Sequence, residues 1–110
     1  MPLPEIEQHR VDKLLSDFCD KRVLPHARDQ VRMIYKVTGS KVILIESRPY
    51  FQNPSIWTET PIAQFEYNAT AKTWSLYAYD RNDNRKLFSK GPLEHLIQEA
   101  DKDVTGIFWG

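Results

Sequence analysis

The sequence predicts an α+β domain, in which an antiparallel meander sheet of four or five strands carries an N-terminal and a C-terminal helix. Apolar residues repeat with a helical period near both ends of the chain, at about residues 5–22 and 92–102. Between residues 31 and 89 several segments, such as Val31–Thr38 and Thr73–Tyr79, instead alternate with the period of two that is typical of strands. Helices segregated from such a run of strands define the α+β class. A chain of 110 residues suffices for one core, so we expect a single domain over residues 1–110.

Both helices are predicted from an apolar stripe and from the residues at their ends. The first stripe consists of Val11, Leu14, Leu15, Phe18 and Cys19. Acidic residues at the start of this helix and basic residues at its end suit the helix dipole. Gly91-Pro92 opens the second helix, whose stripe consists of Leu93, Leu96, Ile97 and Ala100. The tail, residues 104–110, carries Phe108 and Trp109, which we expect to dock on the sheet.

The strands are expected at Val31–Thr38, Val42–Ile45, Ile62–Tyr67, Thr73–Tyr79 and, at one edge, Lys86–Ser89. Gly39-Ser40 is a two-residue hairpin signal, because glycine readily adopts the positive φ that such turns require. The second strand is a continuous apolar run, which predicts that it is covered on both faces.

Residues 48–61 are predicted to form a long loop, because prolines at positions 49, 54 and 61 disfavour regular structure. Loops of this length are typically functional or wrap over a core, and the aromatic residues here argue against disorder. Two interpretations of these aromatic residues stay open, a plug at one end of the core or an exposed binding surface. The residues concerned are Tyr50, Phe51 and Trp57.

Composition limits the classes of function. Fifteen basic and fifteen acidic residues give a formal net charge of zero, which removes the electrostatic argument for a dedicated duplex-DNA or membrane-surface binder. The single cysteine, Cys19, permits no internal disulfide, and its place on the helical stripe predicts an unreactive thiol. The sequence shows neither a signal peptide nor an apolar run of about 18 residues. We therefore expect a soluble cytoplasmic protein.

No cofactor or metal site is predicted. The three histidines are far apart, Cys19 has no partner at CxxC spacing, and the four glycines are isolated rather than clustered around a phosphate. Glu46 and Asp80 are the one pair of carboxylates that we consider for catalysis, and a salt bridge between Glu46 and Arg48 is the favoured interpretation. The sequence therefore argues against an enzyme.

Recognition by aromatic and cationic side chains is the remaining hypothesis. The candidate binding residues are Arg48, Tyr50, Phe51, Trp57, Arg81, Arg85 and Lys86. Such residues anchor protein partners or stack on the bases of single-stranded nucleic acid. We expect a protein partner bound through residues 48–61. The alternative is single-stranded nucleic acid bound by the same residues and the basic turn 81–90, and a small hydrolase or transferase is a third hypothesis. Exposed strand edges also leave room for a homodimer.

Several short motifs together resemble a small bacterial family described only as domain of unknown function 3024. They are Arg28-Asp-Gln-Val31, Glu46-Ser-Arg48-Pro49, Trp57, Ala63-Gln-Phe65-Glu-Tyr67, Trp74-Ser-Leu76-Tyr77, Asp80-Arg-Asn82 and Thr105-Gly106-Ile-Phe108-Trp109-Gly110. The resemblance covers nearly the whole chain. It implies a stand-alone bacterial protein and supplies no activity, ligand or catalytic residue. The family pattern also implies an aromatic residue, often Trp, near Leu87, where this chain offers only Phe88.

Overall fold

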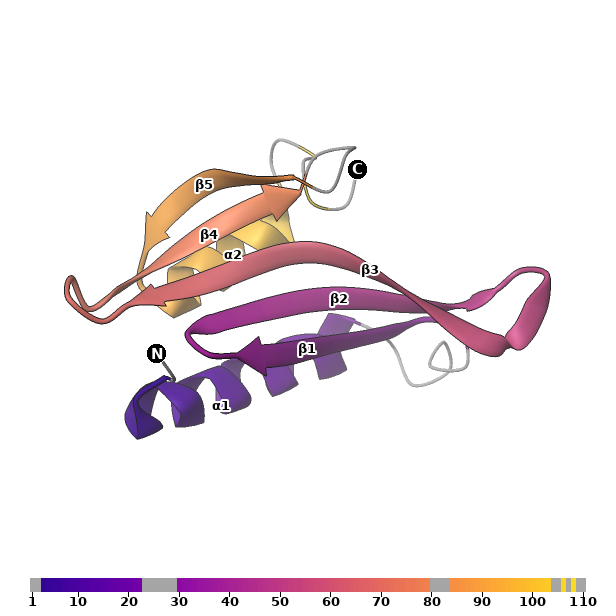
Figure 1. The fold of residues 1–110 in the computed structure, drawn as a ribbon, viewed down its shortest axis with the longest axis horizontal. Helices are drawn as coiled ribbons and strands as arrows, with labels where there is room; N and C mark the ends of the chain where they lie inside the picture. The colour runs from indigo at the N-terminus through magenta and orange to yellow at the C-terminus, as the bar shows by residue number, and fades with distance from the viewer. Residues whose placement is uncertain (1–2, 23–29, 80–83, 104–105, 107, 109–110) are drawn as a thin grey trace.

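The computed structural model describes residues 3–22, 30–79, 84–103, 106 and 108 (Figure 1). Its elements are helix α1 (Glu5–Arg22), strands β1 (Arg32–Thr38), β2 (Lys41–Tyr50), β3 (Asn53–Asn68), β4 (Thr73–Tyr79) and β5 (Arg85–Gly91), and helix α2 (Leu93–Lys102). The strands form one antiparallel sheet in the order β1-β2-β3-β4-β5, in which each strand pairs with its neighbour in sequence. The predicted α+β meander with a helix at each end is confirmed.

One hydrophobic core lies between the sheet and the two helices. Strands β1 to β4 contribute Met33, Val42, Leu44, Ala63, Phe65, Trp74, Leu76 and Ala78, and the helices contribute Val11, Leu15, Leu93, Leu96, Ile97 and Ala100. Both predicted helical stripes therefore face the core. Phe108 joins the same core with 7% of its surface exposed, which confirms that this part of the tail docks on the domain. Trp109 lies outside the described residues.

Polar contacts fix the helices on this face. The indole Nε1–H of Trp74 donates to Glu7 Oε2 at 3.1 Å, which ties α1 to β4. Tyr35 of β1 donates its hydroxyl to Asp12 Oδ1 at 3.0 Å. Between the helices, Arg22 Nη1 lies 3.0 Å from Asp101 Oδ1. In Figure 1, α1 accordingly lies beside β1, while α2 lies behind the other half of the sheet, where it contacts β4 and β5.

The prediction of a loop at residues 48–61 is wrong. Strands β2 and β3 continue through this segment and turn at Phe51 and Gln52, so that a long two-stranded hairpin projects beyond the sheet (Figure 1). We call residues 48–60 the arm. The last pair of β1 with β2 is Arg32 with Ser47, and β4 reaches β3 only as far as Ala63. The arm therefore extends past both neighbouring strands.

The open edges of the arm explain why its prolines do not break it. A proline without an N–H is excluded from a strand that is paired on both sides, but it is tolerated at an open edge or a bulge. Pro49 and Pro54 lie beside the register shift that follows the Pro49–Trp57 pair, and Pro61 lies at the shift between Leu44 and Ile45. Each proline therefore stands where its strand is paired on one edge at most.

The sheet has a second face on which no described helix packs. Because side chains alternate along a strand and cross-strand partners share a face, the register assigns residues to it. We call this surface the open face; it consists of Arg32, Ile34, Lys36, Lys41, Ile43, Ile45, Ser47, Trp57, Glu59, Gln64, Glu66, Ser75, Tyr77, Tyr79, Arg85, Leu87 and Lys90. On this face Ile45 is only 6% exposed, although it lies outside the helix-covered core, whereas Ile43 is half-buried, so β2 is covered fully on the helix side and only in part on the open face.

Strand β5 pairs with β4 along the whole segment and is longer than predicted. The register shifts between Leu76 and Tyr77, so that Phe88 has no direct partner on β4. Its ring packs edge-on against Phe108 with 5.1 Å between the ring centroids. The departure from the family pattern near Leu87 therefore does not prevent β5 from pairing with β4.

Candidate functional site

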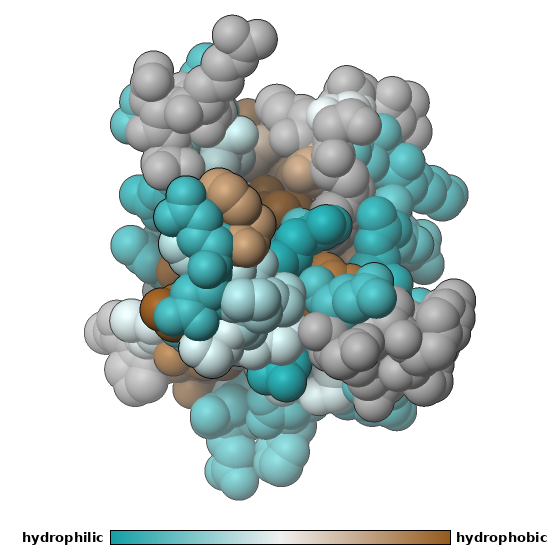
Figure 2. Space-filling model, turned by 90° about the vertical axis from the view of Figure 1, so that its right-hand side faces the viewer, coloured by the Kyte–Doolittle hydropathy of each residue, from teal (hydrophilic) through white to brown (hydrophobic). Residues whose placement is uncertain are grey.

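The tip of the arm is the most exposed apolar surface that the structure describes. Phe51 is 82% exposed, Ile56 is 52% exposed and Tyr50 is 37% exposed. Figure 2 faces this end of the molecule and shows brown, apolar atoms at the surface between teal, hydrophilic ones. The interpretation that Tyr50 and Phe51 plug one end of the core is therefore wrong, because the arm carries them away from it.

Hydrogen bonds within the tip hold its shape. Tyr50 and Phe51 form an edge-on ring pair with 5.3 Å between centroids, and the Tyr50 hydroxyl donates to Gln52 Oε1 at 3.1 Å. Asn53 Oδ1 accepts from the backbone N–H of Ser55 at 3.3 Å and from its hydroxyl at 2.6 Å. Such a side-chain-closed turn limits the conformations of the chain. The apolar groups are thus presented on a tip that is already ordered.

Arg48 and Glu46 lie together at the base of the arm, on the side opposite the open face. Arg48 Nε donates to Glu46 Oε1 at 2.7 Å, which confirms the expected salt bridge. Asp80, the other carboxylate considered for catalysis, lies outside the described residues, as does Arg81. The pair formed by Glu46 and Asp80 therefore falls outside what the structure describes.

Trp57 belongs to the open face rather than to the tip. The guanidinium carbon of Arg32 lies 3.9 Å from the centroid of its ring, a cation–π contact between β1 and the base of the arm. Beside it, Lys36 Nζ lies 2.9 Å from Glu59 Oε1. The candidate residues from the sequence missed Arg32, whose signal was its place in the alternating β1 pattern.

Arg85 and Lys86 are adjacent on β5 but lie on opposite faces of the sheet. Arg85 pairs with Tyr79 and stands over the ring of Tyr77, with 5.4 Å between its guanidinium carbon and the ring centroid. Lys86 pairs with Ala78, a core residue, and so lies at the edge of the helix-covered face. The predicted basic turn therefore does not present a single surface. Arg85 and Trp57 are the two candidates that share the open face.

Gln64 is a buried amide at the centre of the open face. It is 3% exposed, and its Oε1 accepts from the Tyr79 hydroxyl at 3.3 Å, whereas its Nε2 has no hydrogen-bond partner among the described residues. An unpaired buried donor costs stability, so this position reduces the stability of the sheet rather than adding to it.

Cys19 is the single thiol, and it packs against the core from α1. Burial, and secondly the Asp20 carboxylate, raise the pKa of this thiol from 9.0 to about 11. Because the thiolate is the reactive form, we expect Cys19 of the folded protein to react with a disulfide reagent at pH 8 about 100-fold more slowly than in denaturant. Titration with a chromogenic disulfide checks this, and equal rates would contradict it.

The same pKa shift has a consequence for stability. The folded protein favours the neutral thiol, so the contribution of Cys19 to the free energy of unfolding is fully present below pH 9 and is lost as the pH rises through about 11.

Among the residues that the structure describes, no group of three or more His, Cys, Asp or Glu side chains is placed to hold a metal ion. No described helix is long and apolar enough to cross a membrane.

Comparison with known proteins identifies the family. The model of the family DUF3024, a domain of unknown function, matches residues 3–110. The chain belongs to this family. The match spans the arm, the open face and both helices of this DUF3024 domain, as the resemblance of its motifs implies. No curated protein and no solved structure matches the chain.

Proposed function

We propose that this DUF3024 domain is a non-catalytic binding module that engages a protein partner through the tip of its arm. The observation that carries the proposal is the exposure of Tyr50, Phe51 and Ile56 on a projecting hairpin. Large exposed apolar groups gathered at one place mark interaction sites, and aromatic anchors dominate the binding energy of protein interfaces.

The order of the tip supports the same proposal. Association becomes less favourable when flexible side chains must be ordered at the interface, and a surface that is already ordered avoids much of this entropic cost. The contacts between Tyr50 and Gln52 and between Asn53 and Ser55 provide this order. We infer that the tip inserts its aromatic side chains into an apolar groove of the partner.

The chemistry of the arm favours a protein over a charged ligand. Its tip, residues 50–56, contains no ionisable group other than the phenol of Tyr50. At its base, Glu46 and Arg48 neutralise each other.

We propose that the protein acts in the bacterial cytoplasm, because a chain with a single cysteine cannot form the internal disulfides that are typical of oxidising compartments.

Affinity capture from a nuclease-treated bacterial lysate tests the proposal. We expect the double substitution Phe51→Ser and Ile56→Ser to lower the affinity of the purified partner at least about 30-fold, since interface anchors contribute about 2 kcal/mol or more. The free energy of unfolding should change by less than about 1 kcal/mol, because both side chains are exposed.

Ile6→Ser is the matched control. Ile6 lies on α1 and is 71% exposed, so this variant removes an exposed isoleucine without touching the arm. It should bind the partner as tightly as the wild type. Equal losses of affinity in both variants, or retention by the double variant, would exclude the tip as the binding site.

A further inference from the structure

The open face differs from the arm tip in chemistry. It carries five cations, Arg32, Lys36, Lys41, Arg85 and Lys90, against two carboxylates, Glu59 and Glu66. Its net charge is therefore three positive, although the formal net charge of the whole chain is zero. Helices α1 and α2 together carry five basic and eight acidic residues, a net charge of three negative. Charge is thus segregated between the two sides of the domain.

We propose that the open face binds single-stranded nucleic acid. A polyanion is attracted to a positive surface, and the negative helices on the other side orient the domain as it approaches. This site is separate from the arm tip, so it stands or falls independently of the proposed protein partner.

Aromatic side chains paired with arginines supply the second part of the chemistry. On the open face, Arg32 lies over Trp57 near the base of the arm, and Arg85 lies over Tyr77 near the opposite edge of the sheet. Aromatic rings and guanidinium planes both stack on unpaired bases. An acidic peptide offers no planar bases for these groups, so the face suits a single-stranded nucleic acid better.

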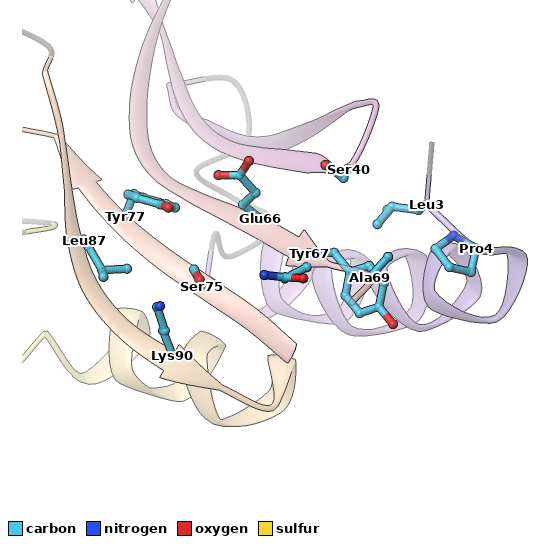
Figure 3. Close-up of a pocket in the computed structure, with 11 residues that line it drawn as sticks. Leu3, Pro4, Ser40, Glu66, Tyr67, Ala69, Ser75, Tyr77, Leu87 and Lys90 are labelled. Carbon is cyan, nitrogen blue, oxygen red and sulfur yellow. The ribbon is translucent and has the colours of Figure 1, made fainter. Parts of the chain in front are cut away.

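A hollow at the end of the open face away from the arm continues this surface. Its volume is about 730 Å³. Figure 3 shows Tyr77, Ser75 and Lys90 extending into the same space from β4 and β5. Glu66, Ser75 and Lys90 form one row across three strands, so the Cα atoms of Glu66 and Lys90 are about 10 Å apart. Among the described residues, neither charge has an ion-pair partner.

The two carboxylates of the open face determine how many of its cations are free to bind phosphates. Lys36 pairs with Glu59 at 2.9 Å, so these two charges cancel. Arg32, Lys41, Arg85 and Lys90 remain for phosphates, while Glu66 opposes binding. We therefore expect Glu66→Gln to bind nucleic acid more tightly than the wild type.

Fluorescence anisotropy with labelled dT12 tests the proposal. If four phosphates are contacted, the affinity should fall about 50-fold between 50 and 200 mM NaCl, because each contact releases counterions. Arg85→Glu with Lys90→Glu should lower the affinity at 50 mM NaCl at least tenfold. Trp57→Leu, which keeps an apolar side chain but removes the ring, should lower it about fivefold or more.

The control is Lys86→Glu with Lys13→Glu, which reverses the same number of charges. Lys86 is next to Arg85 on β5 but lies on the other face, and Lys13 is on α1. This variant should retain affinity within about threefold, and Phe51→Ser with Ile56→Ser should not affect dT12 at all. Equal losses in the two charge-reversed proteins, no binding at 100 µM protein, or tighter binding of polyglutamate than of dT12 would each overturn the proposal.

Discussion

Trp74→Ala should lower the free energy of unfolding by about 3 to 5 kcal/mol, as substitutions of large buried aromatic residues do. Trp74 is 2% exposed, packs against Tyr67 with 5.2 Å between ring centroids, and donates its indole N–H to Glu7 on α1. One side chain therefore joins the sheet, the core and the first helix. The loss is a large part of the 5 to 15 kcal/mol that stabilises a typical domain.

Urea unfolding of Trp74→Phe separates the ring from its hydrogen bond. Phenylalanine fills most of the space but cannot donate to Glu7, so we expect a loss of about 1 to 2 kcal/mol in that variant. If Trp74→Ala lost less than about 1 kcal/mol, the contact between α1 and β4 would not be part of a single cooperative core.

Removal of the arm should abolish partner binding and leave the domain folded. Ser47 and Glu59 are cross-strand partners, so residues 48–58 can be replaced by the two-residue turn Asn-Gly. The core contains no residue of the deleted segment. We expect the free energy of unfolding to fall by less than about 2 kcal/mol, mainly through loss of the contact between Arg32 and Trp57.

Circular dichroism and urea unfolding of the shortened protein check its fold, and capture of the partner checks its function. A shortened protein that is unfolded would mean that the arm supports the sheet. A shortened protein that still binds the partner would place the site elsewhere on the domain.

Periodicity alone predicts much of the sheet and both helices. A periodic apolar pattern indicates that one face of an element is buried. This holds for the helical stripes that contain Val11 and Leu96 and for the alternating residues of β1 and β4. The strand pairs follow from short turns, because consecutive strands joined by a few residues pair with each other.

The arm was missed because the rule that prolines break strands depends on pairing, which a sequence does not show. A local signal for a strand does exist, because the β-branched residues Ile56, Thr58 and Thr60 occupy every second position of residues 56–60. Three prolines outweighed it. The prolines are compatible with strands only because β1 stops opposite Ser47 and β4 stops opposite Ala63, and these ends of the pairing are tertiary features.

The candidate site was predicted in part for the same reason. Tyr50 and Phe51 were selected from the right segment, but their exposure depends on how far the hairpin projects. Arg85 and Lys86 were grouped because they are adjacent, although alternation along β5 separates them. The position of the bulge opposite Tyr77, which sets the face of Lys90, is a packing outcome that no local pattern specified.

Site-specific photo-crosslinking tests the arm proposal most directly. A benzophenone amino acid placed at Phe51 should form one prominent crosslink to a single protein in living cells, while the same group at Ile6, which is similarly exposed on α1, should not. A crosslink from Ile6 to the same protein with equal yield, or no crosslink from Phe51, would contradict the account.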